Sequence, residues 1–220
     1  NFNTDVEHHN AVEWLVDEAG VDVISYSVGW TNAGDGRGTG PINDDVKSAA
    51  QKGVVWAGSA GNYALDHWEG TFQDSDGDGW HNFTPADEIL NWSVSAFDDV
   101  SAWLSWDDFG SWDGYDYSGS NQDYDLYLYM WTGSSWRFVD KSTYAQTGLR
   151  GEWPTEDLST WYGYSATNWG IAIKKKSATR DCTFDLFTMG NTGAVEYNVP
   201  AGSLCSPADA SECVTAGAAD

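Results

Sequence analysis

Basic residues are scarce in this chain. Only 10 of its 220 residues are Lys or Arg, against 34 Asp and Glu, and the formal net charge is −24. A surface this acidic repels the phosphates of nucleic acids and anionic lipid headgroups, so we expect neither nucleic acid nor a membrane as a partner. The same balance is typical of a solvated acidic surface, and it also fits an extracellular or salt-adapted protein.

The chain also lacks long apolar runs and is poor in cysteine. No segment approaches the about 18 uninterrupted apolar residues of a membrane-spanning helix. The three cysteines, Cys182, Cys205 and Cys213, form no C-x-x-C pair, which argues against a zinc site of that kind. The sequence leaves open whether Cys205 and Cys213 form a disulfide.

Helical and strand patterns alternate in the first third of the chain. Residues 10–20 (NAVEWLVDEAG) place apolar side chains at helical spacing, and residues 21–29 (VDVISYSVG) predict a buried strand. Residues 42–53 (INDDVKSAAQKG) predict a second helix capped by Asn43, and residues 54–62 predict a second buried strand. A helix between two such strands is typical of a βαβ unit in a parallel sheet.

Beyond about residue 69 the pattern changes to short alternating strands. In residues 124–130 (YDLYLYM), Leu126, Leu128 and Met130 share one face, while aromatic and acidic side chains take the other. Similar segments follow, separated by polar turns. This pattern predicts an antiparallel β-sandwich.

Small residues and an apolar strand return near the end of the chain, which suggests a return to the parallel sheet. The expected fold class is therefore α/β: a partial parallel-sheet layer that carries an inserted antiparallel, jelly-roll-like β-sandwich. The expected boundaries are 1–68 for the first α/β segment, 69–199 for the β-sandwich and 200–220 for the second α/β segment.

Three segments, VDVISYSVGW, VVWAGSAGN and SPADASECVTAGAAD, resemble in order the corresponding parts of the subtilisin-like serine peptidases, or subtilases. The stretch LSWDD…DYDLYLY resembles the pre-peptidase C-terminal-like β-sandwich of secreted peptidases. The resemblance implies a secreted, extracellular serine endopeptidase that acts on polypeptide substrates.

Asn62 matches the asparagine whose side chain stabilises the oxyanion in the family. Acyl transfer places negative charge on the carbonyl oxygen, and an amide N–H donor stabilises that charge. The resemblance further implies two walls of the substrate cleft: Ser27, Val28 and Gly29 on one side, and Ser59, Ala60 and Gly61 on the other. Alternatively, Gly61-Asn62 is an ordinary turn at a strand end.

No segment resembles the family motifs that carry the catalytic Asp, His and Ser. In family order the Asp and His precede residue 1 and the Ser follows residue 220. We therefore expect an internal segment of a subtilase that is inactive by itself. An incomplete α/β half exposes an apolar sheet, so we also expect self-association.

The stretch DSDGDGWHN predicts a calcium loop. Asp74, Asp76, Asp78 and Asn82 occupy ligand positions 1, 3, 5 and 9 of such a loop. Position 12 is a proline instead of the bidentate Glu, and Asp87 or Glu88 is a candidate substitute. The alternative is an acidic surface turn.

A second functional hypothesis is a β-sandwich that binds protein or glycan on a non-catalytic scaffold. It requires exposed aromatic side chains, and the alternative is that these side chains pack in the core. The candidates are Trp103, Trp106, Trp112, Tyr115, Tyr117, Trp131, Trp136 and Trp153.

Overall fold

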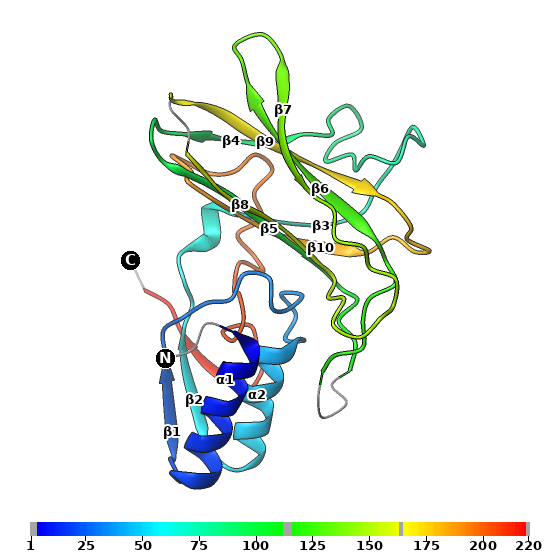
Figure 1. The fold of residues 1–220 in the computed structure, drawn as a ribbon. Coiled ribbons are helices and arrows are strands. Elements are labelled where there is room, and N and C mark those ends of the chain that lie inside the picture. The colour runs from blue at the N-terminus through cyan, green and yellow to red at the C-terminus, as the bar shows by residue number, and fades with distance from the viewer. Residues whose placement is uncertain (1–3, 112–115, 163–164, 219–220) are drawn as a thin grey trace. The chain divides into compact units, whose positions relative to one another are not determined.

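A computed structural model describes residues 4–111, 116–162 and 165–218 (Figure 1). The chain divides into two compact units. The first joins residues 1–62 to residues 204–220, and the second comprises residues 63–203. In the described parts of the chain, no helix is long and apolar enough to cross a membrane.

The first unit contains a parallel sheet of three strands in the order β1-β2-β11. Its elements are α1 (Asp5–Glu13), a π-helical turn (Trp14–Glu18), β1 (Val23–Tyr26), α2 (Pro41–Gln51), β2 (Val55–Ser59) and β11 (Cys213–Ala216). Thr4 caps α1 by accepting a hydrogen bond from the Glu7 backbone N–H at 3.1 Å.

The predicted cap of the second helix is wrong. Helix α2 begins at Pro41 with Gly40 as its N-cap residue. Proline suits this position because its missing N–H would have no partner in the first turn. Asn43 lies inside the helix, and its side chain donates to the Thr39 carbonyl and the Asp209 carboxylate instead.

The two faces of the parallel sheet differ. Ile24 and Trp56 are paired across β1 and β2, and they join a buried cluster with Val46 and Ala49 of α2. The opposite face carries exposed valines at Val23, Val55 and Val214, with exposed fractions of 58%, 49% and 61%. Parallel sheets are ordinarily covered on both faces, so this sheet leaves one apolar face uncovered within the described chain.

The second unit consists of two four-stranded antiparallel sheets. One sheet has the order β3-β10-β5-β8, and the other has the order β4-β9-β6-β7. The strands are β3 (His67–Thr71), β4 (Leu90–Val94), β5 (Asp99–Trp106), β6 (Tyr124–Trp131), β7 (Trp136–Ser142), β8 (Thr155–Tyr162), β9 (Thr167–Lys175) and β10 (Thr183–Met189), and a short 3-10 helix (Tyr63–Leu65) precedes them.

The core of this unit comes from alternating side chains on both sheets. Leu104 of β5 lies opposite Leu186 of β10, and Leu126 of β6 lies opposite Ile173 of β9. All four side chains are fully buried. They belong to the larger apolar cluster that holds the two sheets of the unit together.

The α/β fold class expected from the sequence is wrong. Among the described residues, eight of the eleven strands belong to the two antiparallel sheets, and only β1, β2 and β11 form a parallel sheet. The molecule is therefore mostly antiparallel β-structure with a small parallel sheet. The helical patterns of the first 60 residues are strong local signals, but the parallel sheet is short and has helices on one face only.

Candidate functional site

The residues expected to line a substrate cleft lie at one edge of the parallel sheet. Ser27, Val28 and Gly29 follow the carboxyl end of β1, while Ser59 ends β2 and Ala60, Gly61 and Asn62 follow it. Register brings these ends together, because Tyr26 of β1 lies opposite Gly58 of β2. The Ala60 N–H donates to the Ala216 carbonyl at 2.9 Å, so β11 ends at the same edge.

Close strand packing explains one glycine near this edge. A Cβ on Gly58 would lie 2.9 Å from the Cys213 sulfur on the neighbouring strand. A larger residue at position 58 would therefore require the Cys213 side chain to move. No disulfide joins Cys205 and Cys213 among the described residues, and Cys205 is buried while Cys213 is half-buried.

Asn62 is accessible from solvent at this edge. Its side chain is exposed, as are Ser27, Val28 and Ser59. Gly61 has a φ of +75°, a left-handed conformation that turns the chain directly after β2. Asn62 makes no side-chain hydrogen bond to another described residue, so its amide N–H donors are available to a ligand oxygen.

Two histidines of α1 contact one carboxylate of α2, an arrangement that the sequence did not predict. His8 Nδ1 lies 2.7 Å from Asp45 Oδ2, and His9 Nδ1 lies 2.5 Å from Asp45 Oδ1. His8 and Asp45 are both buried. No sequence signal predicts this contact, because 37 residues separate His8 from Asp45 and only the packing of α1 on α2 joins them.

Aromatic rings surround His8. Its ring contacts Tyr26 edge-on at a centroid distance of 5.4 Å, and Trp30 donates its indole N–H to the Tyr26 hydroxyl at 2.9 Å. Burial raises the pKa of Tyr26 above its ordinary value. The Trp30 hydrogen bond opposes this rise, and the charge of Asp45 adds to it. The cluster fixes the strand that leads into Ser27.

The acidic loop before β4 brings three of its four predicted ligands together. One carboxylate oxygen from each of Asp74, Asp76 and Asp78 lies within 4.8 Å of the others. Asn82 is already engaged, because its carbonyl oxygen accepts hydrogen bonds from the Ser75 N–H and hydroxyl at 2.6 Å.

Backbone groups hold Asp74 in this loop. The N–H groups of Gly77, Asp78 and Gly79 donate to its carboxylate at 2.7 to 3.2 Å. Desolvation acts to raise the pKa of Asp74, but these hydrogen bonds outweigh it and the pKa is lowered. The carboxylate is therefore held in its charged form.

A fourth carboxyl group lies within electrostatic reach of this loop. Burial raises the pKa of Glu88, and so do the charges of Asp78, Asp76, Asp74 and Asp87. Of the two candidate substitute ligands, Asp87 already accepts hydrogen bonds from Tyr197 and from the Ile89 N–H. Neither Asp87 nor Glu88 belongs to the group of carboxylates that lie within 4.8 Å of one another. Carboxylates in this arrangement suit a hard cation such as calcium.

The predicted aromatic residues do not form one exposed row among the described residues. Trp106 and Tyr117 are buried, at 0% and 2% exposure. Trp131 and Trp136 contact each other edge-on across β6 and β7. Trp103, Trp131, Trp136 and Trp153 are half-buried, and Trp112 and Tyr115 lie outside the described residues.

No protein-family model matches the chain, and no curated protein matches its sequence. In fold, the whole chain is similar to the Clostridium perfringens CspB protease, with a TM-score of 0.55 at 12% sequence identity. The chain spans 47% of the length of that protease chain. This similarity supports a protease-related fold, and it does not identify the subtilase family specifically.

Two further structures resemble parts of the chain. The Yersinia pseudotuberculosis-derived mitogen YPM covers 60% of this chain and 90% of its own, with a TM-score of 0.35 at 14% identity. The protein GEBA250068378 from Sulfurospirillum deleyianum covers 56% of this chain and 96% of its own, with a TM-score of 0.31 at 9% identity.

Proposed function

We propose that this chain is part of a secreted, extracellular subtilisin-like serine endopeptidase, to which it contributes an oxyanion-stabilising asparagine and part of the substrate-binding cleft. The observation that carries the proposal is the position of Asn62. It is exposed, lies directly after the carboxyl end of β2, and shares that sheet edge with residues 27–29. The fold similarity to a protease supports the same assignment.

The proposed chemistry follows from the groups at this edge. During peptide hydrolysis the scissile carbonyl oxygen becomes negatively charged, and the Asn62 amide N–H donates a hydrogen bond to it. The exposed backbone of residues 27–29 offers N–H and C=O groups to an extended polypeptide, as a strand edge does. The nucleophile, the general base and its orienting carboxylate come from segments outside these 220 residues.

The coding DNA on either side of this chain provides the first test. The proposal expects upstream segments of the type D-[ST]-G and H-G-T-H, and a downstream segment G-T-S-x-A-x-P. Stop codons at both borders, or flanking segments without these motifs, would overturn it.

Kinetics of the longer protein provide the second test. Asn62→Ala is expected to lower kcat about 10²- to 10³-fold with little change in KM, because the lost donor acts on the transition state. Asn10→Ala, which removes an exposed amide on α1, is the matched control and should leave kcat unchanged. Equal effects of the two substitutions would contradict the assigned role.

A further inference from the structure

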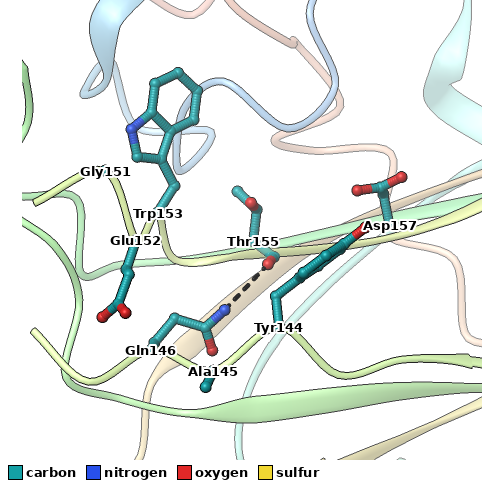
Figure 2. A pocket seen from close by; sticks show the side chains of 8 residues that line it. All are labelled: Tyr144, Ala145, Gln146, Gly151, Glu152, Trp153, Thr155 and Asp157. Carbon is teal, nitrogen blue, oxygen red and sulfur yellow. Dashed lines mark hydrogen bonds between the residues drawn. The ribbon is translucent and has the colours of Figure 1, made fainter. Parts of the chain in front are cut away.

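A pocket of about 410 Å³ lies in the second unit (Figure 2). It is formed by the segment that follows β7 and by the segment that leads into β8. Eight residues line it, among them Tyr144, Gln146, Glu152, Trp153 and Asp157. Its size falls in the range of small-ligand sites.

Gln146 presents an acceptor without a partner. Its Nε2 donates to the Thr155 carbonyl at 3.4 Å (Figure 2) and to Glu156 Oε1 at 3.3 Å. The Thr155 carbonyl can only accept, which favours this orientation of the amide. Gln146 is 3% exposed, and its Oε1 has no hydrogen-bond partner among the described residues. A buried carbonyl without a donor is unfavourable, but this oxygen is itself buried, so it is not presented to a ligand in the pocket.

The charges of the lining residues have one sign. Glu152 and Asp157 are acidic, and none of the eight lining residues is Lys or Arg. The N–H groups of Thr147 and Leu149 donate to Glu152 Oε2 at 2.6 and 2.9 Å. These hydrogen bonds lower the pKa of Glu152, so the group is ionised at neutral pH.

Two aromatic rings contribute to the lining. Tyr144 is 66% exposed. Trp153 is half-buried and held edge-on against Phe109 and Tyr117, at centroid distances of 6.2 and 6.4 Å. Faces of Trp and Tyr attract cations through the ring quadrupole.

We propose that this pocket binds the ammonium or guanidinium group of a lysine or arginine side chain presented by a polypeptide. Such a group carries only donors and a positive charge. The pocket offers a matching set: the carboxylates of Glu152 and Asp157 and two aromatic rings. This binding site is independent of the proposed peptidase chemistry.

An NMR titration of the 220-residue chain at low salt tests the proposal. The probes are acetyl-Gly-Lys-Gly-amide and acetyl-Gly-Arg-Gly-amide. The matched neutral peptides contain norleucine in place of lysine and citrulline in place of arginine. The charged peptides should bind and shift the resonances of residues 144–157, and the neutral peptides should bind at least about fivefold more weakly.

Two substitutions locate the site. Asp157→Asn should weaken binding of the charged peptides about fivefold, whereas Asp98→Asn, at an exposed loop position outside the pocket, should not. Tyr144→Ala should weaken binding, and Tyr144→Phe should restore it because the ring is retained. Asp157 and Tyr144 are exposed, so these changes are expected to leave the fold intact.

Several outcomes would overturn the proposal. If the norleucine and citrulline peptides bind as tightly as the lysine and arginine peptides, the positive charge plays no role in binding. Binding of glucose instead of the charged peptides would assign the pocket to carbohydrate. Equal affinity for ethylguanidinium or butylammonium and for the peptides would show that free cations, not polypeptides, are the ligand. No shift at residues 144–157 with any probe would dismiss the site.

Discussion

The two units of this protein cover their sheets to different degrees. The antiparallel unit buries the facing sides of both sheets, and side chains such as Leu104 and Leu126 are fully inaccessible. The parallel sheet packs helices against Ile24 and Trp56 but leaves Val23 and Val55 exposed on its other face. The antiparallel unit therefore completes its own core, whereas one apolar face of the parallel sheet stays uncovered among the described residues.

Matched core substitutions give the largest expected effect. Trp106→Ala in the antiparallel unit and Trp56→Ala in the parallel unit each remove a side chain that is at most 1% exposed. Each should cost about 3–5 kcal/mol of the free energy of unfolding. Because the units have separate cores, each variant should lower mainly the urea concentration at which its own unit unfolds. Hydrogen exchange at increasing urea concentrations measures the unfolding of each unit separately. If both variants lower both transitions equally, the two units unfold as one.

A buried ion pair in the antiparallel unit provides a pH test. His67 Nδ1 donates to the Val199 carbonyl at 2.6 Å, and His67 Nε2 lies 2.5 Å from Asp185 Oδ1. Burial acts to lower the pKa of His67, but Asp185, Val199 and Glu69 outweigh it and raise the pKa above 6.5. Both ring nitrogens face acceptors, so the geometry favours the protonated ring.

The sign of the pH dependence follows. The protonated ring stabilises the fold, and this contribution is fully present below pH 6.5. It is lost as the pH rises through the raised pKa of the folded state. His67→Gln should therefore destabilise the unit most at low pH, and the difference from the parent should shrink at high pH.

Urea unfolding of parent and variant across pH 5 to 9 measures this difference. The subtraction cancels two background titrations: His81, whose burial lowers its pKa to about 4, and Glu156, whose burial raises its pKa to about 8. A difference that stays constant with pH would show that His67 is not charged in the folded protein.

The uncovered face of the parallel sheet predicts self-association. Val23, Val55 and Val214 lie on one face, because Val23 pairs with Val55 and Val214 pairs with Ala57 two residues further along β2. A second copy of the chain would bury these side chains. Val55→Lys with Val214→Lys should weaken dimerisation at least about tenfold by light scattering, since each lysine opposes burial.

Exposed apolar residues on the other unit supply the control. Leu149→Lys replaces a side chain that is 66% exposed in the antiparallel unit, and it should not change the dissociation constant. A strictly monomeric parent at high concentration would contradict the prediction of self-association.

Calcium is expected to have the smallest effect, and it should act on the antiparallel unit alone. Binding to Asp74, Asp76 and Asp78 would stabilise the folded form by about 1 kcal/mol when calcium is about fivefold above its Kd. Calorimetry should show a higher Tm with calcium, reversed by a chelator. Asp76→Asn should reduce the shift, and Asp98→Asn should not. An unchanged Tm in calcium would mean that the loop is an acidic surface turn.

Local patterns in the sequence identify several elements of both units. The helical spacing near Val12 and the alternation of Leu126 with Leu128 correspond to α1 and β6 in the structure. The same reasoning assigns the wrong fold class, because it weighs the first βαβ pattern above the eight antiparallel strands. It also assigns Asn43 to a helix cap, while the structure starts that helix at Pro41.

Side-chain contacts between distant segments escape sequence reasoning. His8 meets Asp45, and His67 meets Asp185 across 118 residues. The pocket near Gln146 arises because the turn after β7 folds against the start of β8. None of these residues has a local pattern that distinguishes it from an ordinary surface residue.

The sequence alone determined the acidic charge, the spacing of apolar residues within helices and strands, and the small residues that end β2. These features depend on neighbours two to four positions away, which share a face of the same element. Only the tertiary structure decided which strands pair, which histidines meet Asp45, and which segments enclose the pocket near Gln146. Those features depend on strand register and helix packing, which bring together groups that are far apart along the chain.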